Sequence, residues 1–258
     1  MKTALVLSAG GMFGAYEAGA WKALAGSFEP DLVVGASIGA VNGWAIAGGC
    51  APSDLIERWR SLECAARYGW QWPRAWHGGV LDTTALREQL RSVYDAFRPR
   101  CEYALTLTDL KTFRPVVIRG ENVRAEHLLA TTAIICLFEQ VRIGGKLYSD
   151  GGLVNALPLW AAAELGATHI VAINALPVLP GIIPRAFVHL VRLFAPQRST
   201  APLDVETLEI APTTSLGSAL DTILWKRENI DRWIDAGERD AAAHLASIEA
   251  FLHRAPVR

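Results

Sequence analysis

Hydrophobic positions near the start of the chain form two short runs, each followed by small residues and then by a helical segment. The first unit comprises residues 3–7, 10–11 and 16–25, and the second comprises 31–34, 35–39 and 40–47. Two successive strand, turn and helix units predict parallel strands joined by crossover helices, which cover both faces of the sheet. In such sheets the active site lies at the carboxyl ends of the strands.

Periodicity along the rest of the chain predicts further elements of both kinds. Helices are predicted at 53–67, from Thr83 or Thr84 to before Pro99, at 122–133 and from Pro158; strands are predicted at 103–108 with 116–119, at 141–143 with 146–148, and at 169–174. Residues 176–202 are loop-like and contain a possible lid, and 216–254 have helical periodicity with a break near Gly237. We therefore expect one α/β domain over residues 1–258, a three-layer α/β/α sandwich with a mostly parallel central sheet and its core motifs at 4–175.

Composition excludes several classes of function. Hydrophobic residues make up 51% of the 258 residues and charged residues 20%, and the net charge is -1 without a long basic run. The four cysteines form no C-x-x-C pair and have no histidine at ligand spacing, so no metal site, disulfide framework or cofactor is indicated. No segment approaches the roughly 18 apolar residues of a spanning helix. We expect a cytoplasmic protein that binds no nucleic acid and contacts membranes only peripherally.

The second turn carries the pattern G-x-S-x-G, with Gly35, Ser37 and Gly39 between a strand and a helix. A serine hydroxyl is a poor nucleophile unless a strained turn holds it exposed beside a base, and this pattern provides such a turn. The same pattern also occurs where small residues only pack a helix onto a strand. Ser37 is the candidate nucleophile.

The first turn, residues 9–14, offers successive backbone N–H groups beside the second strand. Fixed donors of this kind stabilise the anion of a tetrahedral intermediate, and the candidate donors are Gly10, Gly11 and Met12. A dinucleotide loop would need glycine where Ala9 stands and an acidic residue after the second strand.

A third glycine motif, Asp150-Gly151-Gly152, follows the hairpin strand at 146–148. Its glycines allow the Asp150 carboxylate to approach another loop closely, so that it can accept the Ser37 proton. An ordinary Asp-Gly turn is the alternative reading of this motif alone.

The three motifs in this order resemble those of the patatin-like phospholipase family. The resemblance is densest over residues 4–48 and 130–175 and includes the runs Ala130–Ala133 and Asp150–Pro158. It implies that the glycine run, with Gly14 as its last glycine, forms the oxyanion hole, that Ser37 is the nucleophile and that Asp150 is the base. Three positions depart from the usual pattern: Ala9 replaces a glycine, Phe13 an arginine and Ile135 a proline.

A catalytic triad would need a histidine after Asp150 on a loop near the site. His169 begins a strand at the opposite edge, and His244 and His253 lie in the terminal helical region, which leaves His189 as the alternative base. The dyad instead requires that partial burial raises the basicity of Asp150.

The expected activity is hydrolysis of lipid or simpler carboxylic esters through an acyl-enzyme, without a cofactor. The alternatives are a Ser-His-Asp hydrolase that uses His189 and a non-catalytic or nucleotide-binding α/β module. Residues 185–194 form either a lid or an ordinary surface helix, and Trp70, Trp72 and Trp76 form either a lipid contact or a packed loop cluster. The sequence does not indicate the oligomeric state.

Overall fold

The computed structural model describes residues 1–62, 68–73, 75, 77–181, 185, 186, 188 and 205–252. In this part of the chain eight strands form one mixed sheet in the order β5-β6-β3-β2-β1-β7-β8, with β4 paired to β3. Five strands are parallel: β1 (Thr3–Leu7), β2 (Leu32–Ala36), β3 (Glu102–Asp109), β7 (His169–Ile173) and β8 (Glu206–Ile210). The mostly parallel sheet predicted from the sequence is confirmed.

The remaining strands run antiparallel and extend the sheet beyond β3. They are β4 (Arg114–Arg119), β5 (Val141–Ile143) and β6 (Lys146–Ser149). The two predicted hairpins, β3 with β4 and β5 with β6, are both present. Strand β6 also pairs with the end of β3, where Thr108 lies opposite Ser149. This pairing carries the residue after β6 to the carboxyl edge of the parallel strands.

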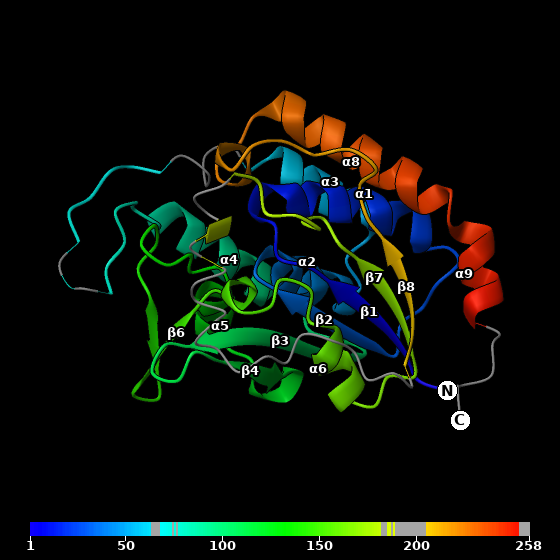
Figure 1. Cartoon of the computed structure of the whole chain (residues 1–258), viewed down its shortest axis with the longest axis horizontal. Helices are drawn as coiled ribbons and strands as arrows, with labels where there is room; N and C mark the ends of the chain where they lie inside the picture. The colour runs from blue at the N-terminus through cyan, green and yellow to red at the C-terminus, as the bar shows by residue number, and fades with distance from the viewer. Residues whose placement is uncertain are drawn as a thin grey trace.

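Alternating residues of the buried strands point to opposite faces of the sheet and belong to two separate hydrophobic cores. In β1, Leu5 and Leu7 belong to the larger core, whereas Ala4 and Val6 belong to the smaller one. The larger core is covered by α1 (Gly14–Leu24), α2 (Ile38–Ala47), α3 (Pro52–Arg60), α4 (Thr84–Ala96), α5 (Ala125–Thr131), α8 (Arg227–Ala242) and α9 (Leu245–Leu252). The short helix α6 (Leu159–Glu164) packs on the opposite face, as Figure 1 shows. The three-layer arrangement is therefore confirmed.

Helices α1 and α8 pack against each other unusually closely. A Cβ atom added at Gly237 would lie 2.0 Å from the Tyr16 carbonyl oxygen, and one added at Gly19 would lie 1.9 Å from that of Ile234. Helix α8 continues through Gly237 to Ala242, so the predicted break at this glycine is wrong. The glycine allows two helices to approach, and the chain breaks only between α8 and α9.

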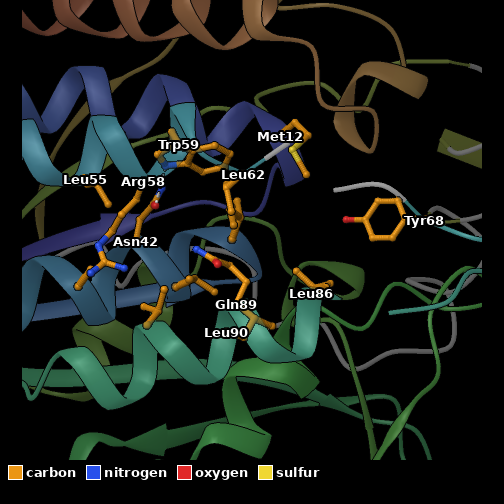
Figure 2. A pocket seen from close by; sticks show the side chains of 14 residues that line it. Met12, Asn42, Leu55, Arg58, Trp59, Leu62, Tyr68, Leu86, Gln89 and Leu90 are labelled. Atoms are coloured by element: carbon orange, nitrogen blue, oxygen red, sulfur yellow. Dashed lines mark hydrogen bonds between the residues drawn. The ribbon is translucent and has the colours of Figure 1, made fainter. Parts of the chain in front are cut away.

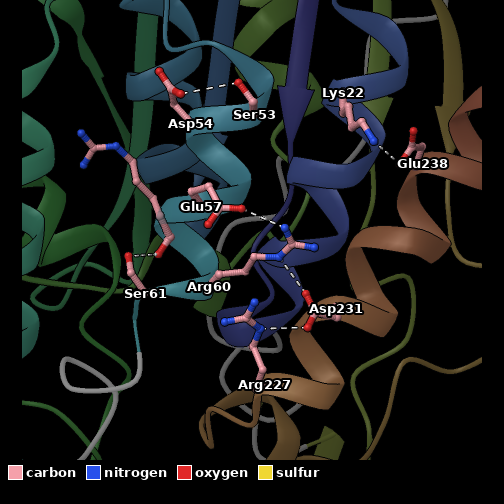
Figure 3. Close-up of polar contacts among 10 residues, drawn as sticks. Lys22, Ser53, Asp54, Glu57, Arg60, Ser61, Arg227, Asp231 and Glu238 are labelled. Atoms are coloured by element: carbon pink, nitrogen blue, oxygen red, sulfur yellow. Dashed lines mark hydrogen bonds and ion pairs between the residues drawn. The ribbon is translucent and has the colours of Figure 1, made fainter.

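Ion pairs on the outer surface join the helices of this layer, as Figure 3 shows. Lys22 of α1 pairs with Glu238 of α8 at 2.8 Å, and Arg60 of α3 pairs with Asp231 of α8 at the same distance. Arg227 pairs with the second carboxylate oxygen of Asp231. These side chains are partly exposed, and exposed pairs contribute little to stability, so we expect the ion pairs to add little to the packing of α1 against α8.

Several predicted boundaries need correction. The segment predicted as helix at 122–133 contains only α5, preceded by a 3-10 turn, η2 (Gly120–Asn122). The helical region predicted at 216–254 starts as a loop with a 3-10 turn, η4 (Leu220–Thr222), and α8 begins only at Arg227. Strand β8 was not predicted. Helix α3 ends at Arg60, while residues 63–67 and most of the possible lid lie outside the described residues.

Candidate active site

Ser37 occupies the sharp turn between β2 and α2. Its backbone has φ 53° and ψ -127°, a conformation that non-glycine residues rarely adopt. Glycines stand two residues before and after Ser37 because a larger side chain at either position would clash with neighbouring backbone atoms. A Cβ atom at Gly35 would lie 2.4 Å from the Ala40 nitrogen, and one at Gly39 would lie 2.4 Å from the Ser8 carbonyl oxygen. The turn thus presents the Ser37 side chain at the carboxyl edge of the sheet.

The Asp150 carboxylate contacts this serine directly. Ser37 Oγ donates to Asp150 Oδ2 at 2.6 Å, and both side chains are buried. The backbone N–H of Gly152 donates to Asp150 Oδ1 at 2.6 Å, which fixes the orientation of the carboxylate. Asp150 follows β6 directly, so the pairing of β6 with β3 positions it beside the turn after β2.

Burial raises the pKa of Asp150 from 3.8 to about 7. The hydrogen bonds from Ser37 and from the Gly152 N–H favour the ionised form and offset part of this shift. A carboxyl group with this pKa is a much stronger base than an ordinary aspartate, yet it is ionised in part at neutral pH. These are the properties that a proton acceptor for a serine hydroxyl requires.

The glycine loop, defined here as residues 9–14, lies opposite the serine turn. Its central turn is η1 (Gly11–Phe13), in which Gly11 has φ 58°. Within the described residues, the N–H groups of Gly10 and Gly11 donate to no acceptor. Both residues line the cavity that contains Ser37 and Asp150, so their amides are available to an oxyanion there.

The site opens into a cavity of about 850 Å³ with a largely apolar wall. Apart from Ser37, residues of 150–156 and residues 185, 186 and 188, it is lined by four segments that are distant in sequence: Ala9, Gly10 and Gly11; Ile134, Ile135 and Leu137; Leu176, Pro177, Val178 and Leu179; and Ala219, Thr222 and Ile223. Arg185 is the cationic side chain among the described residues that line it. A cavity of this volume and polarity accommodates an acyl chain.

The third candidate oxyanion donor, Met12, is placed differently. Its side chain is buried and lines a second cavity of about 70 Å³ between α2, α3 and α4, which contains neither Ser37 nor Asp150. Figure 2 shows Met12 between Leu62 and Tyr68, with Trp59 and Asn42 further along the lining of this small cavity. The role of the Met12 amide stays a prediction.

The other motif glycines are explained by close contacts among the three loops. A Cβ atom at Gly14 would lie 2.7 Å from Ile38 Cγ1, and one at Gly151 would lie 2.2 Å from the Thr106 carbonyl oxygen. One at Gly152 would lie 2.4 Å from the Cβ of Ala9. The motifs found in the sequence therefore converge on one point, although they are up to 141 residues apart in the numbering from Ala9 to Asp150.

Two departures from the usual family pattern have structural explanations. Ala9 lines the cavity and is not among the residues with positive φ, so its methyl group causes no backbone strain. Phe13 is buried in the larger core, and its ring meets that of Trp233 edge to face at 4.9 Å. Phe13 does not line the large cavity, so it has no direct contact with a substrate head group there.

Threonines that the sequence analysis did not single out support the site. Thr131 Oγ1 accepts from the Ser37 N–H at 2.9 Å and donates to the Thr106 carbonyl at 2.8 Å. Thr108 Oγ1 donates to the Asp150 carbonyl at 2.8 Å. No spacing rule points to these residues. The one signal was that Thr131 lies in the Ala130–Ala133 run, part of the resemblance noted above.

None of the histidines within the described residues lines the cavity. His127 caps α5 by accepting from the Arg124 N–H, and His169 packs against Phe251 at the opposite end of β7. His244 Nδ1 lies 2.8 Å from the Asp240 carbonyl. The alternative base, His189, lies outside the described residues. Among the described residues no three His, Cys, Asp or Glu side chains are grouped so as to hold a metal ion, and no helix is long and apolar enough to cross a bilayer.

Comparison with known proteins places this geometry in a family. Residues 5–163 match the patatin-like phospholipase family. The fold is similar to the crystal structure of VipD from Legionella pneumophila, with 13% identity, a TM-score of 0.52, and coverage of 95% of this chain and 67% of that one. The type III effector protein ExoU is also similar, at 12% identity and a TM-score of 0.48, with 96% of this chain and 53% of that one covered. Since the family match covers more than half of the residues of this chain, the chain belongs to the patatin-like phospholipase family and is a hydrolase that acts on ester bonds of lipids.

Proposed function

We propose that Ser37 and Asp150 form a catalytic dyad that hydrolyses carboxylic esters of lipids through an acyl-enzyme. The observation that carries this proposal is the 2.6 Å hydrogen bond between Ser37 Oγ and Asp150 Oδ2, inside a large apolar cavity that the glycine loop also lines. The raised pKa of Asp150 supports its role as the base.

In the first half of the reaction, Ser37 Oγ bonds to the ester carbonyl carbon while its proton passes to Asp150. The N–H groups of Gly10 and Gly11 stabilise the resulting oxyanion, with Met12 as a further candidate donor. The bond to the leaving alcohol then breaks, and the alcohol oxygen takes the proton from Asp150. Ser37 is left acylated, and Asp150 is again ionised.

In the second half, Asp150 accepts a proton from a water molecule that attacks the acyl carbon. The second tetrahedral intermediate collapses, Ser37 regains a proton from Asp150 and the carboxylic acid leaves. The apolar wall of the cavity favours an acyl chain over a polar substrate. A substrate drawn from a lipid layer would also bring the protein into peripheral contact with that layer.

A serine-directed fluorophosphonate probe tests this proposal. We expect the wild-type chain to be labelled and the Ser37→Ala variant to remain unlabelled and inactive toward p-nitrophenyl esters. Asp150→Asn should lower kcat by about 10² to 10⁴, the usual contribution of a general base. Labelling that persists in Ser37→Ala would refute the dyad. An unlabelled wild-type chain that binds adenine nucleotides would instead support the nucleotide-binding module.

A further inference from the structure

A second carboxyl group is buried behind the glycine loop and takes no part in the proposed chemistry. Glu17 of α1 has no exposed surface, and Asn42 Nδ2 donates to its Oε2 at 2.8 Å. Its Oε1 lies 3.5 Å from Ser8 Oγ. Among the described residues it forms no ion pair, and the groups that influence its pKa, Asn42 and Ser8, are both uncharged. Burial without a neighbouring cation raises the pKa of Glu17 well above its usual value and so favours the neutral acid in the folded protein.

The partners of Glu17 hold both ends of the glycine loop. Asn42 donates its amide protons to the Gly14 carbonyl at 2.9 Å as well as to Glu17. Ser8 Oγ lies 2.9 Å from the Ala9 carbonyl, to which it donates, and accepts from the Ala175 N–H. The network therefore reaches the carbonyl of the first residue of the loop and that of the last.

The same network fixes the loop relative to the nucleophile. Asn42 lies on α2, the helix that begins at Ile38 directly after Ser37. On its other side, Asn42 Oδ1 accepts from Trp59 Nε1 of α3 at 3.1 Å, and Figure 2 shows this pair beside the small cavity. A neutral Glu17 completes the pattern, because its hydroxyl can donate to Ser8 while its other oxygen accepts from Asn42. Every polar group of the cluster then has a partner of the right kind.

We propose that Glu17 is a positioning residue, which holds the glycine loop against α2 so that the amides of Gly10 and Gly11 face the oxyanion that forms at Ser37. It touches neither substrate nor reacting atoms and acts through Asn42 and Ser8. This inference rests on the proposed function, because the loop matters only if Ser37 acylates. Misplacement of a catalytic group by about 1 Å can cost about a hundredfold in rate, so a loosened loop should lower kcat and leave KM almost unchanged.

Two variants of Glu17 separate positioning from packing. Glu17→Gln is neutral and can both accept from Asn42 and donate to Ser8, so we expect kcat within about twofold of the wild type. Glu17→Leu has a similar volume but neither accepts nor donates, so we expect kcat to fall about tenfold or more, with KM changed less than about twofold. The rate of inactivation by a fluorophosphonate should fall in parallel. All measurements are made well below the melting temperature of each variant.

A destabilised control distinguishes these effects from a general loss of stability. Ile248→Ala creates a cavity in α9, remote from the loop, and should lower Tm while leaving kcat unchanged. Glu17→Leu with wild-type kcat would overturn the proposal, as would a Glu17→Gln variant as impaired as Glu17→Leu. If the wild-type chain neither reacts with the probe nor turns over esters, the proposed function itself fails and this inference fails with it. Failure of the Glu17 variants alone leaves the dyad intact.

Discussion

The Asp150 side chain experiences two opposing demands at the scale of a single residue. The proposed role as a base needs the ionised form, whereas burial favours the protonated form and raises the pKa to about 7. The hydrogen bonds from Ser37 and the Gly152 N–H lower the pKa of Asp150, but by less than burial raises it. The same carboxyl group should therefore govern both the pH dependence of the reaction and part of the pH dependence of stability.

The first prediction concerns the pH profile of the reaction. Because the base acts only when ionised, kcat/KM for a soluble ester should rise with pH, with an apparent pKa of about 7, and reach a plateau above it. Initial rates with p-nitrophenyl acetate between pH 5 and 9 measure this profile. A rate that is already constant between pH 5 and 7 would show that Asp150 is not the base.

The second prediction concerns stability, where the sign is opposite to that for activity. The native state binds a proton at Asp150 more tightly than the unfolded chain does, so this group contributes stability that is present below about pH 4 and lost as pH rises through about 7. Asp150→Asn removes the charge; its amide oxygen can still accept from the Gly152 N–H, while its Nδ2 can donate to Ser37 Oγ instead of accepting from it. At pH 8 we expect this variant to raise the free energy of unfolding by on the order of a few kcal/mol, and therefore to raise Tm. At pH 4 we expect Tm to change little. Thermal unfolding at both pH values tests this, and a lower Tm at pH 8 would contradict it.

The candidate catalytic residues could be found in the sequence because each lies beside glycines, and the spacing of these glycines indicates a crowded turn. Ser37 and Asp150 carried this signal and lie within hydrogen-bonding distance in the structure. Glu17 carried no signal and Thr131 only its place in the Ala130–Ala133 run, because their partners, the Asn42 side chain and the Ser37 amide, are distant in sequence. Whether Ser37 and Asp150 catalyse hydrolysis stays a prediction until the variants are measured.

At the scale of elements, the sequence predicted strands with continuous apolar runs better than those without. Strand β1 has the predicted bounds, and every residue of it is buried. Strand β8 was missed because Thr207 and Glu209 are exposed, which leaves few apolar positions in a strand at the end of the sheet. Gly237 was misread because glycine breaks isolated helices, yet here contact with α1 outweighs that tendency.

The third prediction follows from the close contact of α1 with α8. A methyl group at position 237 would press on the Tyr16 carbonyl, so Gly237→Ala should destabilise the protein by about 1–3 kcal/mol although alanine is the better helix former. Gly26→Ala is the matched control, because its Cβ would meet no atom within 4 Å and Gly26 is not among the glycines with positive φ. It should leave stability unchanged or raise it slightly. Denaturant unfolding of both variants measures the difference, and equal stabilities would contradict this reading.

At the scale of the whole molecule, some exposed apolar side chains lie on segments that line the large cavity or pair with its wall. Val178 lines the cavity, and Leu220 lies between lining residues Ala219 and Thr222. Trp70 and Trp72 are 84% and 94% exposed on a loop that bridges to Leu81, whose amide donates to Leu137 of the cavity wall. Trp76, the third tryptophan of this loop, lies outside the described residues. Indole rings favour the boundary between water and lipid, which makes this loop the candidate membrane contact.

The fourth prediction separates contact with lipid from chemistry. A Trp70→Ser, Trp72→Ser double variant should hydrolyse a soluble ester at the wild-type rate but bind phospholipid vesicles more weakly by at least about tenfold, because burying each apolar side chain contributes about 1.5–3 kcal/mol. Flotation and the release of fatty acid from vesicles measure the two effects. Arg91→Ala, on the exposed face of α4, serves as the control. Equal vesicle binding by the double variant would exclude this loop as the contact.

The fold that supports the site includes elements that lie after the residues matched by the family. The match ends at residue 163, yet β7 lies beside β1 in the sheet, and α8 covers the helix that carries Glu17. A chain truncated after residue 163 would keep every catalytic motif but leave one edge of β1 unpaired and α1 open to solvent. Such a fragment should be recovered as aggregate, so an engineered minimal hydrolase has to retain the segment through Ala242.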